Sequence, residues 1–432
     1  TSEYDLRMMW PVYDRLTYVN EKGEVEPMLA ERWELAPDGS TFTIHLRPGV
    51  TFSDGAKLTA DAVKANFDRG LGEARGSAFQ QLAASVASVE TVDPLTVQLN
   101  LKGPGGALPF LLGDRAGIMV SPRALDNPDL DRKLVGAGAF VLVASSPGTS
   151  YEYERRDDYW DRNAYRFKNM HLLVQPDDAT RLNAVRSGQL DATFIRETQV
   201  AQAKAAGLNT ISGPRLSFYS LTLNSKRSEF ADPRVRQALS TAIDRRAISE
   251  GIFAGRCSPT VQPFPQGYFA HANDLTGEND WLRYDPRRAR ELLAEAGLPN
   301  GFTFTAVTPT ITGYQTLAQV LKEQLAKVGV TMKIRVVDTA QAGQFSSGSL
   351  DALVGSYAGA VDPSIYTGAA YLPGGPLNPG GLTTPKIEQL HTEALSSTDL
   401  KSRGVAYARL MSAVLEMGPA DLPICFRGGD MA

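Results

Sequence analysis

The chain has 432 residues, of which 43% are hydrophobic and 21% are charged, and its formal net charge is −4. At roughly 150 residues per domain this length predicts two or three domains, and the composition is that of a folded protein. Acidic and basic residues are interspersed without a Lys/Arg run, so we expect no nucleic-acid partner. The two cysteines, Cys257 and Cys425, lie outside any C-x-x-C motif and leave their pairing open.

The first third of the chain is predicted to be rich in β structure. Residues 41–47 alternate apolar and polar side chains with period two, which predicts a half-buried strand. Thr59 is expected to cap a helix that runs through residues 61–67. Residues 92–101 are predicted to form one strand that ends at the glycine-rich turn of residues 103–106.

The middle of the chain is predicted to contain both helix and strand. Residues 177–187 suit a helix, with Gly188 as the residue that ends it. Residues 191–195 and residues 216–224 are each predicted to form a strand, because apolar and β-branched residues recur there.

The later part has the clearest helices. Three of them are expected to begin with a polar cap followed by proline, at 232–233, 285–286 and 384–385. A further helix is predicted over residues 314–328, followed by a strand over residues 330–336. Helices that alternate with strands in this way favour an α/β fold.

No catalytic or metal-binding motif is present in the sequence. The four histidines are isolated, and neither H-E-x-x-H, G-x-S-x-G nor a phosphate-binding P-loop occurs. The acidic pairs at residues 157–158 and 177–178 are expected to lie in turns or at helix N-termini. We therefore expect no catalytic residues, no metal and no cofactor, and a protein that binds something small.

A series of segments, in the same order, resembles the signature stretches of family 5 extracellular solute-binding proteins, the oligopeptide-, dipeptide- and nickel-type receptors of ABC transporters. The segments are residues 12–16 (VYDRL), 23–33 (GEVEPMLAERW), 46–55 (LRPGVTFSDG), 58–63 (LTADAV), 136–140 (GAGAF), 158–160 (DYW), 187–191 (SGQLD), 232–239 (DPRVRQAL), 242–245 (AIDR), 284–297 and 362–363. The resemblance covers nearly the whole chain.

The resemblance implies an α/β fold, namely the bilobed periplasmic-binding-protein fold of type II, cluster C, with an extra β-rich domain. Domain I is expected to be discontinuous, comprising residues 1–18, 123–224 and 420–432. Domain II is expected to be the inserted β-rich part, residues 19–122, and domain III residues 225–419. In this family the ligand is held between two lobes that close by a hinge.

The resemblance also implies the function, the solute-binding subunit of an ABC importer that delivers its ligand to permease and ATPase subunits in the membrane. The expected protein is a monomer, either periplasmic or lipid-anchored outside a Gram-positive cell. No apolar run reaches the ~18 residues that span a bilayer. The chain starts at Thr1 without an initiator Met, so we expect a processed or trimmed chain. A receptor for chemosensing, a chaperone and a hydrolytic enzyme remain as alternatives.

The resemblance narrows the range of ligands that we expect. Peptide receptors of this family hold the ligand's α-ammonium with an Asp shortly before the D/E-P pair of domain III. Here the matching position is Gly359 or Ala360, and neither carries a carboxylate. Asp362 could substitute, although a turn-capping role beside Pro363 is an equal alternative. The expected ligand is a small organic solute that is peptide-like, opine-like, or an anionic or chelate compound.

The nickel-type receptors suggest three further ligand residues. Tyr357 falls on an aromatic of their motif, Phe79 matches an aromatic that packs on the ligand, and Arg115 matches an Arg that contacts a chelator carboxylate. No histidine matches their metal contact, since His391 lies too far downstream. Each candidate has a structural alternative, which is a core residue for Tyr357, helix packing for Phe79 and a surface ion pair for Arg115.

Four more residues complete the candidate ligand site. They are Trp10 and Tyr13 near the start of the cleft, and Tyr219 and Asn224 on the strand that connects the lobes. The same structural alternatives apply to them.

Overall fold

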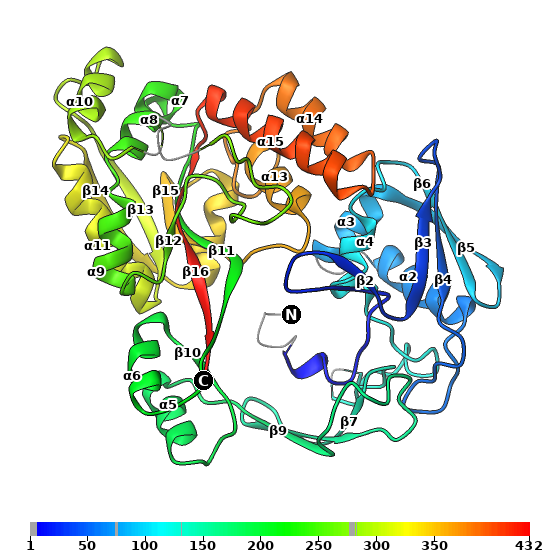
Figure 1. Cartoon of the computed structure of the whole chain (residues 1–432). Coiled ribbons are helices and arrows are strands. Elements are labelled where there is room, and N and C mark those ends of the chain that lie inside the picture. Colours follow the sequence, from blue (N-terminus) through cyan, green and yellow to red (C-terminus); the bar gives the residue numbers. More distant parts are fainter. Residues whose placement is uncertain (1–6, 74–76, 131, 276–280, 282) are drawn as a thin grey trace. The chain divides into compact units, whose positions relative to one another are not determined.

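The computed structural model describes residues 7–73, 77–130, 132–275, 281 and 283–432 (Figure 1). The chain divides into two compact units. Unit 1 comprises Thr1–Pro176 with Leu395–Leu400, and unit 2 comprises Asp177–Ala394 with Lys401–Ala432. Within the described residues, no helix combines the length and the apolar character that crossing a membrane requires. The finer division into three domains stays a prediction.

Unit 1 is built on antiparallel sheets. The largest has the strand order β3-β4-β6-β5. Its strands are β3 (Ala30–Leu35), β4 (Thr41–Leu46), β5 (Val86–Asp93) and β6 (Thr96–Leu101). The smaller sheets pair β1 (Thr17–Val19) with β2 (Val25–Pro27), and β7 (Phe140–Ser146) with β8 (Ser150–Arg155) and β9 (Asn169–Leu173).

Two strand predictions for unit 1 have different outcomes. The strand over residues 41–47 is confirmed as β4, whose side chains alternate between half-buried and buried. The single strand over residues 92–101 is wrong, because the chain turns between Asp93 and Thr96. The Asp93 carboxylate accepts a hydrogen bond from the Leu95 N–H at 2.8 Å, and this turn joins β5 and β6 into a hairpin.

The helices of unit 1 are few. Those with described bounds include α2 (Ala60–Glu73), α3 (Ser77–Ser85), α4 (Leu108–Leu111) and the 3₁₀ helix η1 (Arg115–Gly117). The predicted helix after Thr59 is confirmed as α2, and Thr59 Oγ1 accepts a hydrogen bond from the Ala62 N–H at 3.2 Å.

Unit 2 is organised around a mixed sheet with the strand order β10-β16-β11-β15-β13-β14, to which β12 adds by pairing with β16. β13 pairs in parallel with β14 and β15, whereas β11 pairs antiparallel with β15 and β16. The strands are β10 (Phe194–Ile195), β11 (Ile211–Leu223), β12 (Ser258–Pro259), β13 (Thr303–Pro309), β14 (Thr331–Val337), β15 (Ala352–Tyr357) and β16 (Asp421–Met431).

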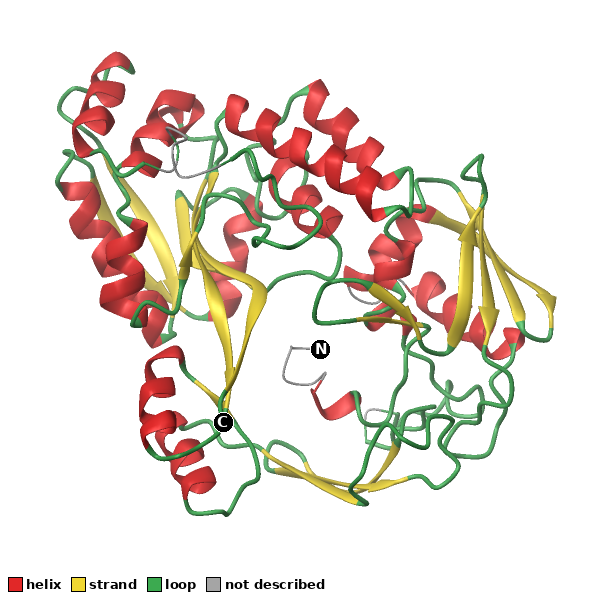
Figure 2. Ribbon diagram, viewed as in Figure 1, coloured by secondary structure: helices red, strands yellow, loops and turns green. Residues whose placement is uncertain are grey.

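Helices cover both faces of this sheet (Figure 2). Alternate residues of β11 enter two different cores, since Tyr219, Leu221 and Leu223 pack in one and Phe218 packs in the other. The helices are α5 (Asp178–Arg186), α6 (Val200–Ala205), α7 (Ser228–Ala231), α8 (Pro233–Thr241), α9 (Arg245–Phe253), α10 (Pro286–Glu295), α11 (Thr312–Ala326), α12 (Thr339–Gly343), α13 (Pro363–Tyr371), α14 (Pro385–Leu395), α15 (Leu400–Met417), and the 3₁₀ helices η2 (Glu197–Gln199) and η3 (Gln344–Ser347).

The predicted helix starts of unit 2 are confirmed by their caps. The side chains of Asp177, Asp232 and Asp285 each accept backbone N–H bonds at the first turn of their helices. Thr384 Oγ1 accepts the Ile387 N–H at 3.3 Å at the start of α14. The predicted helix over residues 314–328 is α11, shifted by two residues, as is usual at helix ends.

The strands of unit 2 depart more from prediction. The strand over residues 191–195 shrinks to the two residues of β10, and the strand over residues 216–224 is the second half of the longer β11. The structure also settles the open question of the cysteines. Cys257 and Cys425 form a disulfide, with 5.3 Å between their Cα atoms, beside the pairing of β12 with β16.

Candidate functional site

The predicted ligand residues are divided between the two units. Trp10, Tyr13, Phe79 and Arg115 belong to unit 1, and Tyr219, Asn224, Tyr357 and Asp362 belong to unit 2. Across the described part of the chain, no group of three or more His, Cys, Asp or Glu side chains is placed to hold a metal ion.

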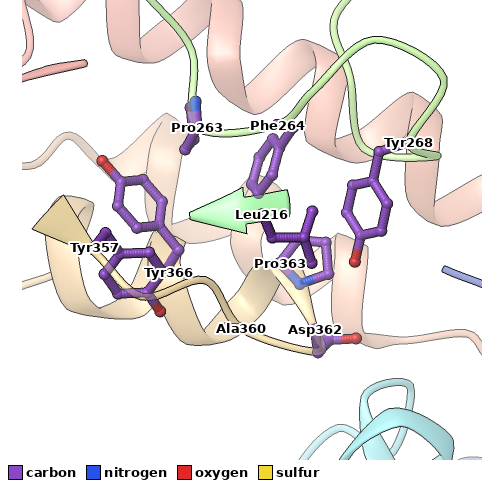
Figure 3. A pocket seen from close by; sticks show the side chains of 9 residues that line it. All are labelled: Leu216, Pro263, Phe264, Tyr268, Tyr357, Ala360, Asp362, Pro363 and Tyr366. Atoms are coloured by element: carbon purple, nitrogen blue, oxygen red, sulfur yellow. The ribbon is translucent and has the colours of Figure 1, made fainter. Parts of the chain in front are cut away.

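Unit 2 carries an aromatic pocket, shown in Figure 3. The residues that line it are Leu216, Pro263, Phe264, Tyr268, Tyr357, Ala360, Asp362, Pro363 and Tyr366. Its volume is about 10 Å³, which is about the room that one water molecule needs. Two predicted ligand residues, Tyr357 and Asp362, thus meet in one place.

Tyr357 is held by its strand and by aromatic neighbours. It ends β15 and lies opposite Phe218 of β11, with ring centroids 5.8 Å apart. The Tyr366 ring meets it edge-to-face at 4.8 Å. Burial raises the pKa of the Tyr357 hydroxyl above its ordinary value, so the group stays protonated at neutral pH.

Asp362 is fully buried and already has partners. Its Oδ1 accepts the Ser364 N–H at 2.9 Å and so caps α13. Its two oxygens also accept from Arg403 Nη2, at 2.7 and 2.9 Å, in an ion pair whose side chains are both 0% exposed. This geometry favours the capping role over the binding of a ligand's ammonium group.

Sequence reasoning missed the polar group behind the pocket. Asp421 begins β16, is fully buried, and accepts hydrogen bonds from Thr222 Oγ1 at 2.6 Å and from the Tyr366 hydroxyl. Burial raises the pKa of the Asp421 carboxyl. The sequence offers no signal for Asp421, because its partners Thr222 and Tyr366 lie 199 and 55 residues away.

Tyr219 and Asn224 do not reach the pocket. Tyr219 lies opposite Ser356 and Cys425 on the other face of the sheet and stacks on Phe253, with ring centroids 4.7 Å apart. The Asn224 amide donates to two backbone carbonyls of the chain segment before β15, each at 2.9 Å, and its Oδ1 accepts the Lys226 N–H at 3.0 Å. Both side chains have structural roles here.

Three of the four candidates of unit 1 pack against protein groups. Tyr13 is 2% exposed in a core of aromatic residues, and burial raises its pKa to about 12. The Trp10 ring lies 4.4 Å from the Arg15 guanidinium. The Phe79 ring lies against Gly70, where a Cβ atom would come within 1.9 Å of it, so it joins α3 to α2.

Arg115 differs from the others. It begins η1, is half-buried, and its Nε is covered by protein atoms without any hydrogen-bond acceptor. The described residues form no ion pair with its guanidinium, in contrast to the surface ion pair that was its structural alternative. Its neighbour Asp114 has a raised pKa, chiefly because of burial, and the charge of Arg115 opposes this shift.

Asp14 explains why two of the recognised sequence segments occur together. Its carboxylate accepts hydrogen bonds from Trp160 Nε1 at 2.7 Å and from the Tyr159 hydroxyl at 3.1 Å. Burial raises the pKa of Asp14 to about 6. Residues 12–16 and 158–160, far apart in sequence, are thus joined through one buried carboxylate.

The chain is similar in sequence to a family of bacterial binding proteins. The model of bacterial extracellular solute-binding proteins, family 5 Middle, matches residues 24–376. The glutathione-binding protein GsiB of Salmonella typhimurium is 33% identical over 334 residues, which cover 76% of this chain and 64% of that protein. The chain therefore spans less than two thirds of that relative's length.

Two solved structures are also similar. One is AgaA of A. tumefaciens R10 in complex with agropinic acid, with 27% identity, a TM-score of 0.81, and coverage of 98% of this chain and 87% of that one. The other is NikA of Brucella suis in complex with Fe(III)-EDTA, with 25% identity, a TM-score of 0.83, and coverage of 98% and 89%. These matches confirm the predicted α/β periplasmic-binding-protein fold.

Proposed function

Because the chain belongs to the bacterial extracellular solute-binding proteins of family 5, we propose that it is the solute-binding subunit of an ABC importer. In this role it captures a small organic anion by hinge closure and delivers it to a membrane permease. A ligand drives such closure only by binding the closed state more tightly than the open one.

The proposal also covers catalysis, oligomeric state and cellular location. The family consists of transport-associated binding proteins, so we assign the chain no catalytic step. We place it as a monomer outside the cytoplasm, in the periplasm or lipid-anchored in a Gram-positive host. The disulfide between Cys257 and Cys425 supports this location, since disulfides persist in oxidising compartments.

The ligand class rests mainly on Arg115. The Arg115 guanidinium is half-buried and has no carboxylate partner among the described residues, so it is suited to receive an anionic oxygen. The similar proteins agree, since glutathione, agropinic acid and EDTA all carry carboxylates and are named as ligands of GsiB, AgaA and NikA. We therefore propose a solute that bears at least one carboxylate.

A second observation argues against recognition of a ligand's ammonium in the manner of peptide receptors. Gly359 has a φ of +87°, in the left-handed region that disfavours other residues. A Cβ atom there would lie 3.0 Å from the Leu216 backbone carbon. The position therefore disfavours an aspartate, whose Cβ atom would add a close contact to a backbone of positive φ, and Asp362 is committed to Arg403.

Native mass spectrometry of freshly purified protein, followed by calorimetric titration with glutathione, agropinic acid and Fe(III)-EDTA, tests the proposal. We expect one bound anion per chain, and a loss of more than tenfold in affinity for Arg115→Ala, equivalent to about 1.4 kcal/mol. Arg123→Ala is the matched control, because this exposed arginine follows in the same part of the chain and its Nη1 donates to the Asp54 backbone carbonyl at 3.2 Å. A neutral solute bound equally well by the Arg115 variant would refute the anionic ligand.

A further inference from the structure

A second arginine is presented beside Arg115 by the backbone of unit 1. We define the arginine loop as residues 113–118. The segment that carries Arg15 runs antiparallel to it, through a β-bridge between Arg15 and Ile118 and a 3.0 Å hydrogen bond from the Leu16 N–H to the Gly117 carbonyl. A Cβ atom at Gly117 would lie 1.8 Å from a backbone oxygen, so the tight shape of the loop depends on glycine.

The Arg15 guanidinium packs against two aromatic rings. Its guanidinium carbon lies 4.4 Å from the ring centroid of Trp10 and 5.3 Å from that of Tyr18. Nη1 donates to the Gly113 carbonyl of the arginine loop at 3.2 Å. Its Nε, like that of Arg115, is covered and has no acceptor. The side chain is thus oriented, while no carboxylate of the described residues pairs with its charge.

The two arginines at the arginine loop lack ion-pair partners. The described residues provide no ion pair for Arg15 or for Arg115. Asp114, which lies next to Arg115 in sequence, feels the charge of both, yet it forms no ion pair with either. Burial raises the pKa of Asp114. Arg15 also feels the charge of Asp14, but that carboxylate accepts hydrogen bonds from Trp160 and Tyr159 and forms no ion pair with Arg15 among the described residues.

Arg47 shows how a structural arginine of the same unit differs. Its guanidinium also lies over a tryptophan, 4.3 Å from the Trp160 ring centroid. However, its Nε donates to the Met28 carbonyl at 3.0 Å, and Nη1 lies 3.6 Å from a carboxylate oxygen of Glu31. Arg47 thus stacks on an aromatic ring and still has partners for its donors. Arg15 differs, because its Nε has no acceptor and its charge has no carboxylate partner among the described residues.

We propose that Arg15 and Arg115 together bind one carboxylate of a small organic anion at the arginine loop, with Arg15 oriented by Trp10 and Tyr18. This inference rests on the proposed function, and it adds a residue and a binding mode to it. A planar guanidinium can offer two parallel N–H donors to a carboxylate, which gives the site geometric specificity as well as charge. The ligand would then be recognised by a carboxylate at one end.

Calorimetric titration with glutathione as the probe tests this inference in the full chain. The variants are Arg15→Ala, Arg15→Lys, Arg115→Ala and the double alanine variant, with Arg47→Ala as the matched control. We expect Arg15→Ala to weaken binding at least tenfold, and Arg15→Lys to weaken it several-fold because lysine keeps the charge but not the planar fork. The double variant should lose less than the product of the single losses, because both groups contact one carboxylate.

The control separates binding from stability. Arg47→Ala should leave the affinity within twofold of wild type, and circular dichroism should show that every variant is folded. If Arg15→Ala binds glutathione as tightly as wild type, or no more weakly than Arg47→Ala does, the inference is overturned while the proposed function stands.

If the wild-type chain does not bind glutathione, citrate replaces it as the probe in thermal unfolding at constant ionic strength. A larger increase in Tm for wild type than for Arg15→Ala and Arg115→Ala supports the two-arginine site, even though glutathione is then not the solute. Equal increases for all three proteins overturn the inference.

Discussion

The buried ion pair between Asp362 and Arg403 gives the sharpest test of what the aromatic pocket does. Both side chains are 0% exposed, and Asp362 also caps α13. Removal of one member leaves an uncompensated buried charge, which costs about 3–5 kcal/mol, and loss of the cap adds about 1 kcal/mol. We therefore expect Asp362→Ala to lower the free energy of unfolding of unit 2 by about 4–6 kcal/mol.

Urea unfolding of the ligand-free chain measures this loss. Asp362→Asn should lose less, because the amide oxygen can still cap the helix and accept from Arg403. Combining Asp362→Asn with Arg403→Met should recover part of the lost free energy of unfolding, since no buried charge then remains. The reasoning is refuted if Asp362→Ala keeps its free energy of unfolding within about 0.5 kcal/mol while its ligand affinity falls tenfold or more. Asp362 would then be a ligand carboxylate rather than a structural one.

Three further predictions concern stability. Replacement of Cys257 and Cys425 by alanine opens a loop of 168 residues and should cost about 5 kcal/mol in the chain-entropy model; unchanged calorimetric stability would contradict it. Burial raises the pKa of Asp14 to about 6, above the ~3.9 of an unfolded chain, so the native state binds the extra proton between these values. The free energy of unfolding should thus fall by about 3 kcal/mol as pH rises from about 3 to about 7. Asp14→Asn should flatten this slope, and a slope that persists in the variant would speak against the assignment. Gly359→Ala should lose about 1–3 kcal/mol in urea unfolding, because it adds a close contact to a backbone of positive φ. Gly374→Ala, with positive φ but open space around its Cβ position, should lose less, and equal losses would rule out the contact as the cause.

Local rules predicted the helices of unit 2 well. A capping Asp followed by proline specifies a helix start through contacts within four residues, so Asp232 and Asp285 are visible in the sequence. Strand lengths were predicted less well, because a strand ends where its partner ends. β10 has two residues since its pairing with β16 stops there, and the hairpin turn after Asp93 was read as part of a strand.

The candidate ligand residues were harder to predict than the strands, because their roles also depend on residues distant in sequence. Tyr357 and Tyr219 look alike in the sequence, yet pairing in β11 and β15 places them on opposite faces of one sheet. Asp362 was named as a candidate with capping as an alternative. Only its hydrogen bonds with Arg403, 41 residues away, show that its charge is neutralised within the protein. Arg15 and Asp421 were not singled out at all, because their significance depends on partners distant in sequence.

By itself, the sequence determined the family, the positions of most helices and the absence of known catalytic motifs, since these depend on residue order and on contacts between near neighbours. The tertiary structure decided which charged side chains are already neutralised. Asp362 is paired and capped, whereas Arg15 and Arg115 each keep a covered donor without an acceptor. The physical reason is that the free energy of a buried charge is set by the groups that surround it in space, and these come from segments that the sequence keeps far apart.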